Sequence, residues 1–168
     1  MRPGGLSLIP FSEGEPPRDV GQGPMKSFLH TVDTQKSFEA AVEAVEVKVA
    51  ENNFRVVNTY DVAASLTEQG YPRSPLKVIE VCNARYASEA LEKDINVALM
   101  LPCPIAVYTE GGKTFISTMR PSAMVALCPA SGLDQIASEV DRVVLQIVDE
   151  AARVPSLPSD RERPIVVG

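Results

Sequence analysis

The chain has 168 residues, of which 45% are hydrophobic and 23% are charged. This length and composition are typical of a globular protein with one substantial core, and they exclude the low hydrophobicity of a disordered chain. The formal charge of −6 leaves no excess of Lys and Arg to hold a phosphate backbone, so we expect no nucleic-acid partner.

The cysteine content and the apolar pattern favour the cytoplasm. No apolar run approaches the roughly 18 residues of a membrane-spanning helix, and the N-terminus lacks the pattern of an export signal. Three cysteines, an odd number, favour reduced thiols over a disulfide framework. We therefore expect a cytoplasmic protein that does not bind membranes.

The distribution of Pro and Gly divides the chain into three parts. Residues 1–25 are rich in both and have no regular period, which predicts a flexible arm. Residues 26–153 carry the periodic apolar patterns and predict a single α+β domain. Residues 154–168 contain three prolines and predict a loose tail.

Apolar periodicity predicts the elements of the domain. In chain order they are a strand at 28–32, a helix at 37–53, a strand at 54–59, a short helix at 61–69, a strand at 76–81, a short helix at 84–93, strands at 97–110 and 113–120, and a long helix with an apolar stripe from Leu133 to Ala151. Their predicted N-terminal caps are Ser37, Asp61, Asn83 and, for the last helix, Ser131.

The segment 97–110 contains Pro102 and Pro104, which we expect at a bulge or a sheet edge because proline cannot donate to a ladder. Gly111-Gly112 predicts a two-residue hairpin turn. The resulting register sets Tyr108 opposite Phe115 and Val107 opposite Ile116. Continued back through the prolines, it sets Cys103 opposite Arg120.

The element order predicts the α+β class: strand, helix, four strands, helix, with a mostly antiparallel sheet, two long helices on one face and short helical insertions. The hairpin is apolar on both faces, with Ile105, Val107 and Ile116 on one and Tyr108, Phe115 and Met119 on the other. Two helices cover one face. We expect the second face to pack on another copy in a homodimer, with an apolar ligand cavity as the alternative.

The stretch from Val78 to Thr118 resembles the domain of unknown function 302 family. The resemblance rests on Cys82-Asn83, Ala90-Leu91 and Leu101-Pro102-Cys103, and it extends over roughly 26–153. It implies a strand, a helix, four strands and a helix, similar to the TATA-binding-protein-like class, and it implies no established activity. The family usually has Pro after Asn, where this chain has Ala84.

Cys82, Asn83 and Cys103 form the candidate ligand or thiol site, because the strand ends that carry them are expected to approach. Arg120 or Arg85 is the candidate cation that would lower a thiol pKa and so raise the reactive thiolate fraction. The alternative is that both cysteines are small core side chains. Asn83 would then be only a helix cap.

Other chemistries find little support in the sequence. His30 is the single histidine, which weakens Cys–His and Ser–His–Asp catalysis. No paired Cys or His spacing predicts a metal site, and no phosphate loop or dinucleotide fingerprint is present. No cofactor is indicated. We interpret Cys128, in the connection before the last helix, as a structural residue that fills space in the core.

Three functions remain open. The favoured one is a small module that binds a ligand or a partner at the pocket around Cys82, Asn83 and Cys103. The alternative is a thiol-based redox or sulfur-transfer protein, in which one of these cysteines is the nucleophile and the other resolves the intermediate. The third is a purely structural or interaction domain. The sequence does not decide whether the protein is an enzyme.

Overall fold

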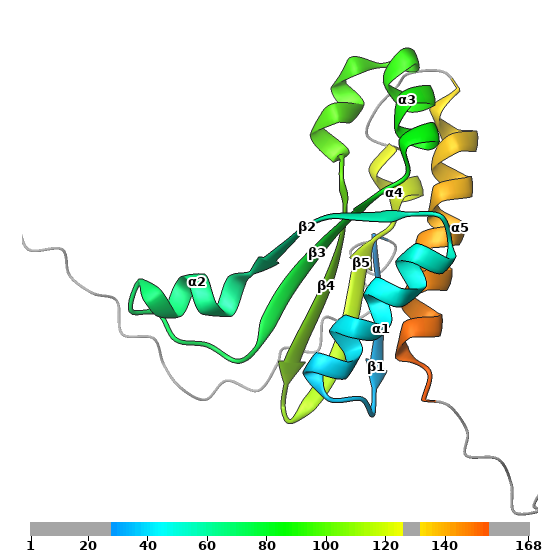
Figure 1. Ribbon diagram of the computed structural model, residues 1–168. Helices are drawn as coiled ribbons and strands as arrows, with labels where there is room; N and C mark the ends of the chain where they lie inside the picture. Colours follow the sequence, from blue (N-terminus) through cyan, green and yellow to red (C-terminus); the bar gives the residue numbers. More distant parts are fainter. Residues whose placement is uncertain (1–27, 126–131, 155–168) are drawn as a thin grey trace, which may run out of the picture.

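The computed structural model describes residues 28–125 and 132–154. Its centre is one five-stranded antiparallel sheet in the order β1-β5-β4-β3-β2 (Figure 1). The strands are β1 (Leu29–Thr34), β2 (Arg55–Asp61), β3 (Leu76–Cys82), β4 (Cys103–Glu110) and β5 (Lys113–Met119). Two long helices, α1 (Phe38–Glu51) and α5 (Leu133–Ala152), cover one face of the sheet.

Shorter helical segments join these elements. They are α2 (Val62–Glu68), α3 (Ala84–Lys93), the 3₁₀ helix η2 (Ile95–Met100) and α4 (Pro121–Val125). The α+β class and the order of strands and long helices are therefore confirmed, whereas α4 was not predicted. Likeness to the TATA-binding-protein-like class stays a prediction. The predicted arm lies outside the described residues, as does the predicted tail beyond Val154.

Side-chain caps start three helices where the sequence predicts them, with Ser37 at α1, Asp61 at α2 and Asn83 at α3. Ser37 accepts a hydrogen bond from the Ala40 N–H (3.2 Å) at α1, and Asp61 accepts one from the Ala64 N–H (2.9 Å) at α2. These bonds satisfy donors that have no partner within the helix. At α5 the cap position is Gly132 with φ 87° and no side-chain bond. The predicted cap Ser131 lies outside the described part of the chain.

The hairpin between β4 and β5 has the predicted register. Gly111 and Gly112 both have positive φ, 56° and 78°, as a two-residue turn of the primed type requires. Tyr108 is paired with Phe115, and their rings stack with centroids 5.3 Å apart. The paired strands form the middle of the sheet.

The prediction of one long strand at 97–110 is wrong in its first half, where the chain forms η2. The expectation for the prolines is also wrong for Pro104. It lies in the central strand β4, opposite Glu80, with no shift of register there. The position is tolerable because Pro104 is only the second residue of the strand, before the ladder with β5 begins at Ile105. Among the described ladders, the register shifts in β2, between Val56 and Asn58.

Buried side chains form two clusters that meet at α5. The main cluster lies between the sheet and the helices α1 and α5. The smaller cluster is built around Ala90, Val97 and Leu133, where α3 and η2 meet the first turn of α5. Figure 1 shows this part of α5 beside α3, beyond the strands. Ile136 packs against both clusters, so it lies at the boundary between them, which we call the seam.

Burial predicts a large difference between two isoleucine truncations. Ile147→Ala removes a fully buried side chain of α5 and should lower the free energy of unfolding by about 2 to 5 kcal/mol. Ile95→Ala, at a position 72% exposed, should change it by less than about 0.5 kcal/mol. Urea unfolding measures both. Equal losses would contradict the placement of the core.

Candidate functional site

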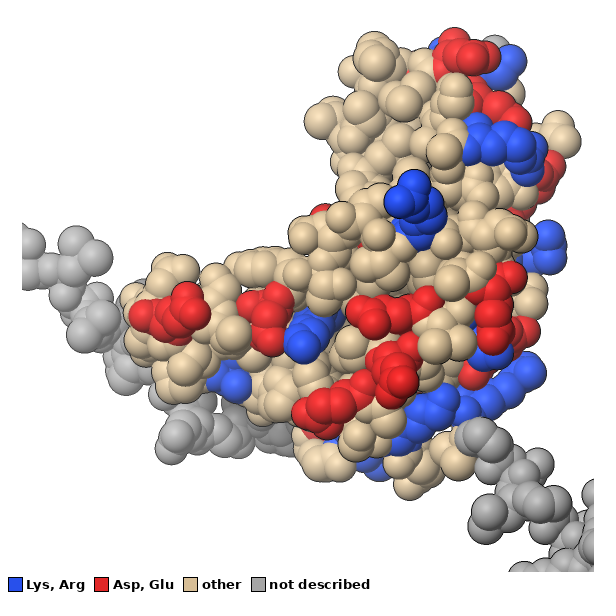
Figure 2. All heavy atoms as spheres, viewed as in Figure 1, with Lys and Arg blue, Asp and Glu red and all other residues tan. Residues whose placement is uncertain are grey.

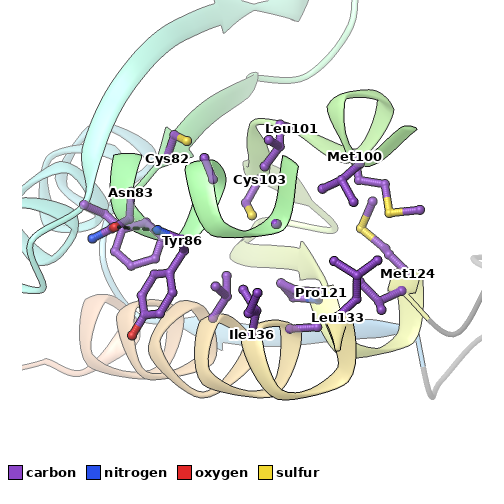
Figure 3. Close-up of a pocket in the computed structure, with 17 residues that line it drawn as sticks. Cys82, Asn83, Tyr86, Met100, Leu101, Cys103, Pro121, Met124, Leu133 and Ile136 are labelled. Carbon is purple, nitrogen blue, oxygen red and sulfur yellow. Dashed lines mark hydrogen bonds between the residues drawn. The ribbon is translucent and has the colours of Figure 1, made fainter. Parts of the chain in front are cut away.

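An apolar cavity of about 70 Å³ lies at the seam between the two clusters (Figure 3). Its walls come from the ends of β3 and β4 and from α3, η2, α4 and α5. The residues that line it are Phe54, Cys82, Asn83, Tyr86, Ala87, Ala90, Val97, Met100, Leu101, Cys103, Pro121, Met124, Val125, Leu133, Ile136, Ala137 and Val140. Cys82, Asn83 and Cys103 are thus brought to one place, and Arg120 is not among the lining residues.

The cavity is large enough for more than a single water molecule. One water needs about 10–15 Å³ of volume accessible to a probe of its size, and it needs polar partners. The lining offers few of them, namely the Asn83 amide, the Tyr86 hydroxyl and the two thiols. A cavity of this kind favours apolar groups over water.

Cys103 opens β4 and packs against the main cluster. Burial, with a smaller effect of the nearby Cys82 thiolate, raises the pKa of its thiol from 9.0 to about 11. A thiol with this pKa is protonated at neutral pH. In this state it is an apolar, polarisable wall group and a poor nucleophile.

Cys82 ends β3 and is also partly buried. Burial raises the pKa of its thiol, and a hydrogen bond with the Asn83 backbone offsets part of this rise. No arginine contributes to the pKa shift of either thiol. The setting is therefore the reverse of the cation-activated thiol that the sequence suggested.

The strand ladder sets the direction of the two cysteines. Val81 lies opposite Cys103 in the ladder and is fully buried beneath the helices, so Cys103 shares this face. Consecutive residues of a strand alternate between its two faces, so the ladder does not set Cys82 opposite Cys103, although both residues line the cavity. Both thiols are free. The geometry thus gives no support to a nucleophile and its resolving thiol.

Arg120 is held by a carboxylate instead of facing the thiols. Its guanidinium donates to Asp141 on α5 (2.9 Å), and the Ser122 hydroxyl and N–H donate to the same carboxylate (2.8 and 3.3 Å). Burial alone would raise the pKa of Asp141, but these hydrogen bonds outweigh it and hold the pKa below its usual value. The ladder between β4 and β5 ends at Ile105 opposite Thr118, so the pairing of Cys103 with Arg120 lies beyond it and stays a prediction. On the other side of β5, the Arg120 N–H donates to the Phe28 carbonyl (2.7 Å).

The cluster of Arg120, Ser122 and Asp141 fixes one wall of the cavity. It joins the end of β5 and the start of α4 to the middle of α5. Pro121 and Met124, which line the cavity, lie on the short helix that this cluster holds. Arg120 is therefore a positioning residue for the wall.

Asn83 is the cap of α3, as the simpler reading of the sequence predicted. Its side-chain oxygen accepts from the N–H groups of Arg85 and Tyr86 (3.0 and 3.3 Å). Its amide nitrogen donates to the Asn53 carbonyl (2.9 Å), which ties α3 to the chain that leaves α1. With these bonds Asn83 holds the mouth of the cavity in shape.

The family model for "Domain of unknown function DUF302" matches residues 30–151. The chain belongs to the DUF302 family. The crystal structure of an uncharacterized conserved protein DUF302 from Bacillus stearothermophilus is similar, with a TM-score of 0.71 and 28% sequence identity over 75% of this chain and 98% of that chain. No curated protein matches the chain.

Most of the cavity wall of this DUF302 protein was not predicted as part of a site. Met100, Met124, Leu133 and Ile136 look like ordinary core residues in the sequence. They meet only because η2, α4 and α5 pack together beyond the sheet. No local motif marks such a place.

His30 is a further residue of the DUF302 chain that the sequence singled out. His30 lies in β1, partly buried, and its ring makes a 2.7 Å hydrogen bond with Asp149. In residues 28–125 and 132–154, no three His, Cys, Asp or Glu side chains gather as metal ligands. No helix in these ranges is long and apolar enough to cross a membrane. Cys128 lies outside them.

The raised pKa of Cys103 predicts a loss of stability at high pH. Between about pH 9 and 11 the folded thiol stays protonated while the unfolded one ionises, so the free energy of unfolding falls as the pH rises. From pH 8.5 to 11, we expect this fall to be about 2 kcal/mol smaller in Cys103→Ala than in the native chain. Urea unfolding measures it.

Val107→Ala is the control for that experiment, because it truncates a buried neighbour that does not titrate. It should keep the native pH dependence. If Cys103→Ala and the native chain lost equal stability at high pH, the thiol would have to ionise freely in the folded protein.

Proposed function

We propose that this DUF302 protein binds a small apolar ligand in the cavity at the seam. The observation that carries the proposal is the cavity itself, an apolar volume bordered by four helical segments and two strand ends. An empty apolar cavity costs a fold roughly 20 to 30 cal/mol per Å³. A bound apolar group would recover that cost and add contacts with the lining.

The surface beside the cavity is also apolar. Ile95 and Leu99 of η2 are 72% and 88% exposed. Figure 2 shows few charged side chains over η2, whereas charged side chains of both signs gather along α3 and acidic ones over α1. An apolar surface next to the opening suits the approach of an apolar ligand.

The neutral thiols agree with this function. Protonated Cys82 and Cys103 are apolar wall groups, and their raised pKa values suit packing against a ligand better than nucleophilic attack. Free thiols persist in a reducing compartment. We therefore place the protein in the cytoplasm as part of the proposal.

Binding of 1-octanol tests the proposal, with isothermal titration calorimetry as the measurement. The native chain should bind the alcohol with a negative heat-capacity change, as burial of apolar surface requires. Ala87→Leu puts extra volume into the cavity and should weaken binding about tenfold or more. The matched control is Ala64→Leu, on the exposed surface of α2, which should bind like the native chain.

Failure of the native chain to bind 1-octanol would count against an apolar ligand. Equal binding by Ala87→Leu and the native chain would place the alcohol somewhere else. Thermal unfolding of both variants should show that each is folded.

We further propose that the protein is a homodimer through the sheet face that no helix of residues 28–125 and 132–154 covers. Ladder alternation places a row of apolar side chains there, namely Leu29, Phe115, Met119, Ala106, Tyr108, Leu76, Val78 and Tyr60. Leu29 and Met119 are 42% and 37% exposed in the single chain. A second copy is the occupant that we favour, because it is always present and a two-fold interface buries the same face on both chains.

A charge in the middle of this face should separate the subunits. Ala106→Glu lies on the central strand and should convert a species of twice 18.1 kDa into a monomer, as measured by sedimentation equilibrium. Ala50→Glu makes the same change on the exposed surface of α1 and should leave the dimer intact. A native chain that is monomeric at micromolar concentration would refute the dimer.

A further inference from the structure

A second hollow, of about 360 Å³ and polar, adjoins the apolar cavity. Phe54, Asn83 and Tyr86 line both spaces. The rings of Phe54 and Tyr86 lie at the junction, with centroids 6.3 Å apart. The polar hollow thus borders the proposed ligand site across these shared residues.

Two arginines from different elements line the polar hollow. Arg85 comes from the first turn of α3 and Arg142 from the middle of α5. Both are exposed at the surface. Arg142 makes no ion pair among the residues for which side chains are described. Arg85 is paired with Glu89 (3.0 Å), an exposed contact that solvent weakens.

The charge of the hollow is positive although the chain as a whole is acidic. Its one acidic lining residue, Glu51, is held by Lys48 at 2.6 Å. Two arginines and one carboxylate leave one net positive charge in the lining. This balance matches a ligand with a single negative charge better than a doubly charged phosphate.

Three of the amide side chains that line the hollow, those of Asn52, Asn83 and Gln146, already donate hydrogen bonds. Asn52 donates to the Lys48 carbonyl (2.9 Å), and Gln146 donates to Glu150 (2.9 Å). The arginines are therefore the main donors left for a ligand. A guanidinium donates through a planar fork that fits a carboxylate with two parallel hydrogen bonds.

We infer that the ligand is an amphiphile with one carboxylate, whose apolar body lies in the cavity and whose carboxylate binds at Arg85 and Arg142. The inference rests on the proposed function and names the chemical class of its ligand. The apolar and polar spaces are adjacent, so one molecule of short chain length reaches both. Neither space alone indicates a ligand with both an apolar body and a carboxylate. The position of the two spaces next to each other does.

Octanoate and 1-octanol separate the two parts of this inference, because they share an apolar chain and differ in the head group. Calorimetry with the full chain at low salt should show octanoate binding about three- to tenfold more tightly than the alcohol. That is the range expected of exposed ion pairs and charged hydrogen bonds. The advantage should shrink as salt screens the charges.

Arg142→Gln and Arg85→Gln should each remove much of the octanoate advantage and leave 1-octanol binding unchanged. The control is Arg73→Gln, which removes the same charge from an exposed loop outside both spaces. This control should bind both ligands like the native chain. Thermal unfolding checks that each variant is folded.

The outcomes distinguish the inference from the proposal beneath it. The carboxylate inference is overturned while apolar binding stands if 1-octanol binds and octanoate binds no better. The same holds if Arg85→Gln and Arg142→Gln leave octanoate binding unchanged. If neither ligand binds the native chain, the proposed function fails as well. A loss of octanoate binding in Arg73→Gln equal to that in Arg142→Gln would show a general effect of charge and would also overturn the inference.

Discussion

The structure depends on a mismatch of length between α5 and the sheet beneath it. A helix of 20 residues is about 30 Å long, whereas a strand of six to eight residues spans about 20 to 26 Å. The C-terminal turns of α5 bury Val144, Ile147 and Val148 against the sheet. Its first turn buries Leu133 where no strand lies beneath, so α3, η2 and α4 supply the partner surface. The cavity lies where these two packings join, around Ile136.

A buried carboxylate keeps the join in place. Asp141 is 6% exposed, and in the middle of an apolar helix face such a group is costly unless it is fully bonded. Arg120 and Ser122 supply those bonds and thereby attach the strand end and α4 to α5. Removing one partner would leave a buried charge without compensation. The polar cluster thus specifies how the short elements meet α5, which apolar contacts alone specify less sharply.

Local patterns predicted the parts of the fold that depend on local physics. Caps such as Ser37 and the turn at Gly111-Gly112 follow from backbone donors and from φ, so short motifs reveal them. The sequence predicts a strand for the segment that forms η2, because a short apolar run has the same composition in a strand and in a helix. The sequence predicts Pro104 at a bulge or a sheet edge, since it does not show where a ladder begins.

The candidate site was predicted in part for the same reason. Cys82, Asn83 and Cys103 come together because β3 and β4 are neighbours, which the hairpin-like order of strands suggested. The partner of Arg120 could not be foreseen, because Asp141 looks like one more polar residue of an amphipathic helix. The face on which each cysteine lies depends on the strand register at single-residue resolution. Sequence patterns rarely give that resolution at a strand end.

The proposed site for an amphipathic ligand would account for the seam, the neutral thiols and the two arginines together. The central claim is that the seam encloses accessible apolar volume. A crystal of the protein pressurised with xenon tests it most directly, because xenon enters apolar cavities without needing hydrogen bonds. The account predicts xenon density inside the cavity, between the lining residues Ile136 and Cys103. Crystals in which side chains fill this space and no xenon enters it would contradict the account.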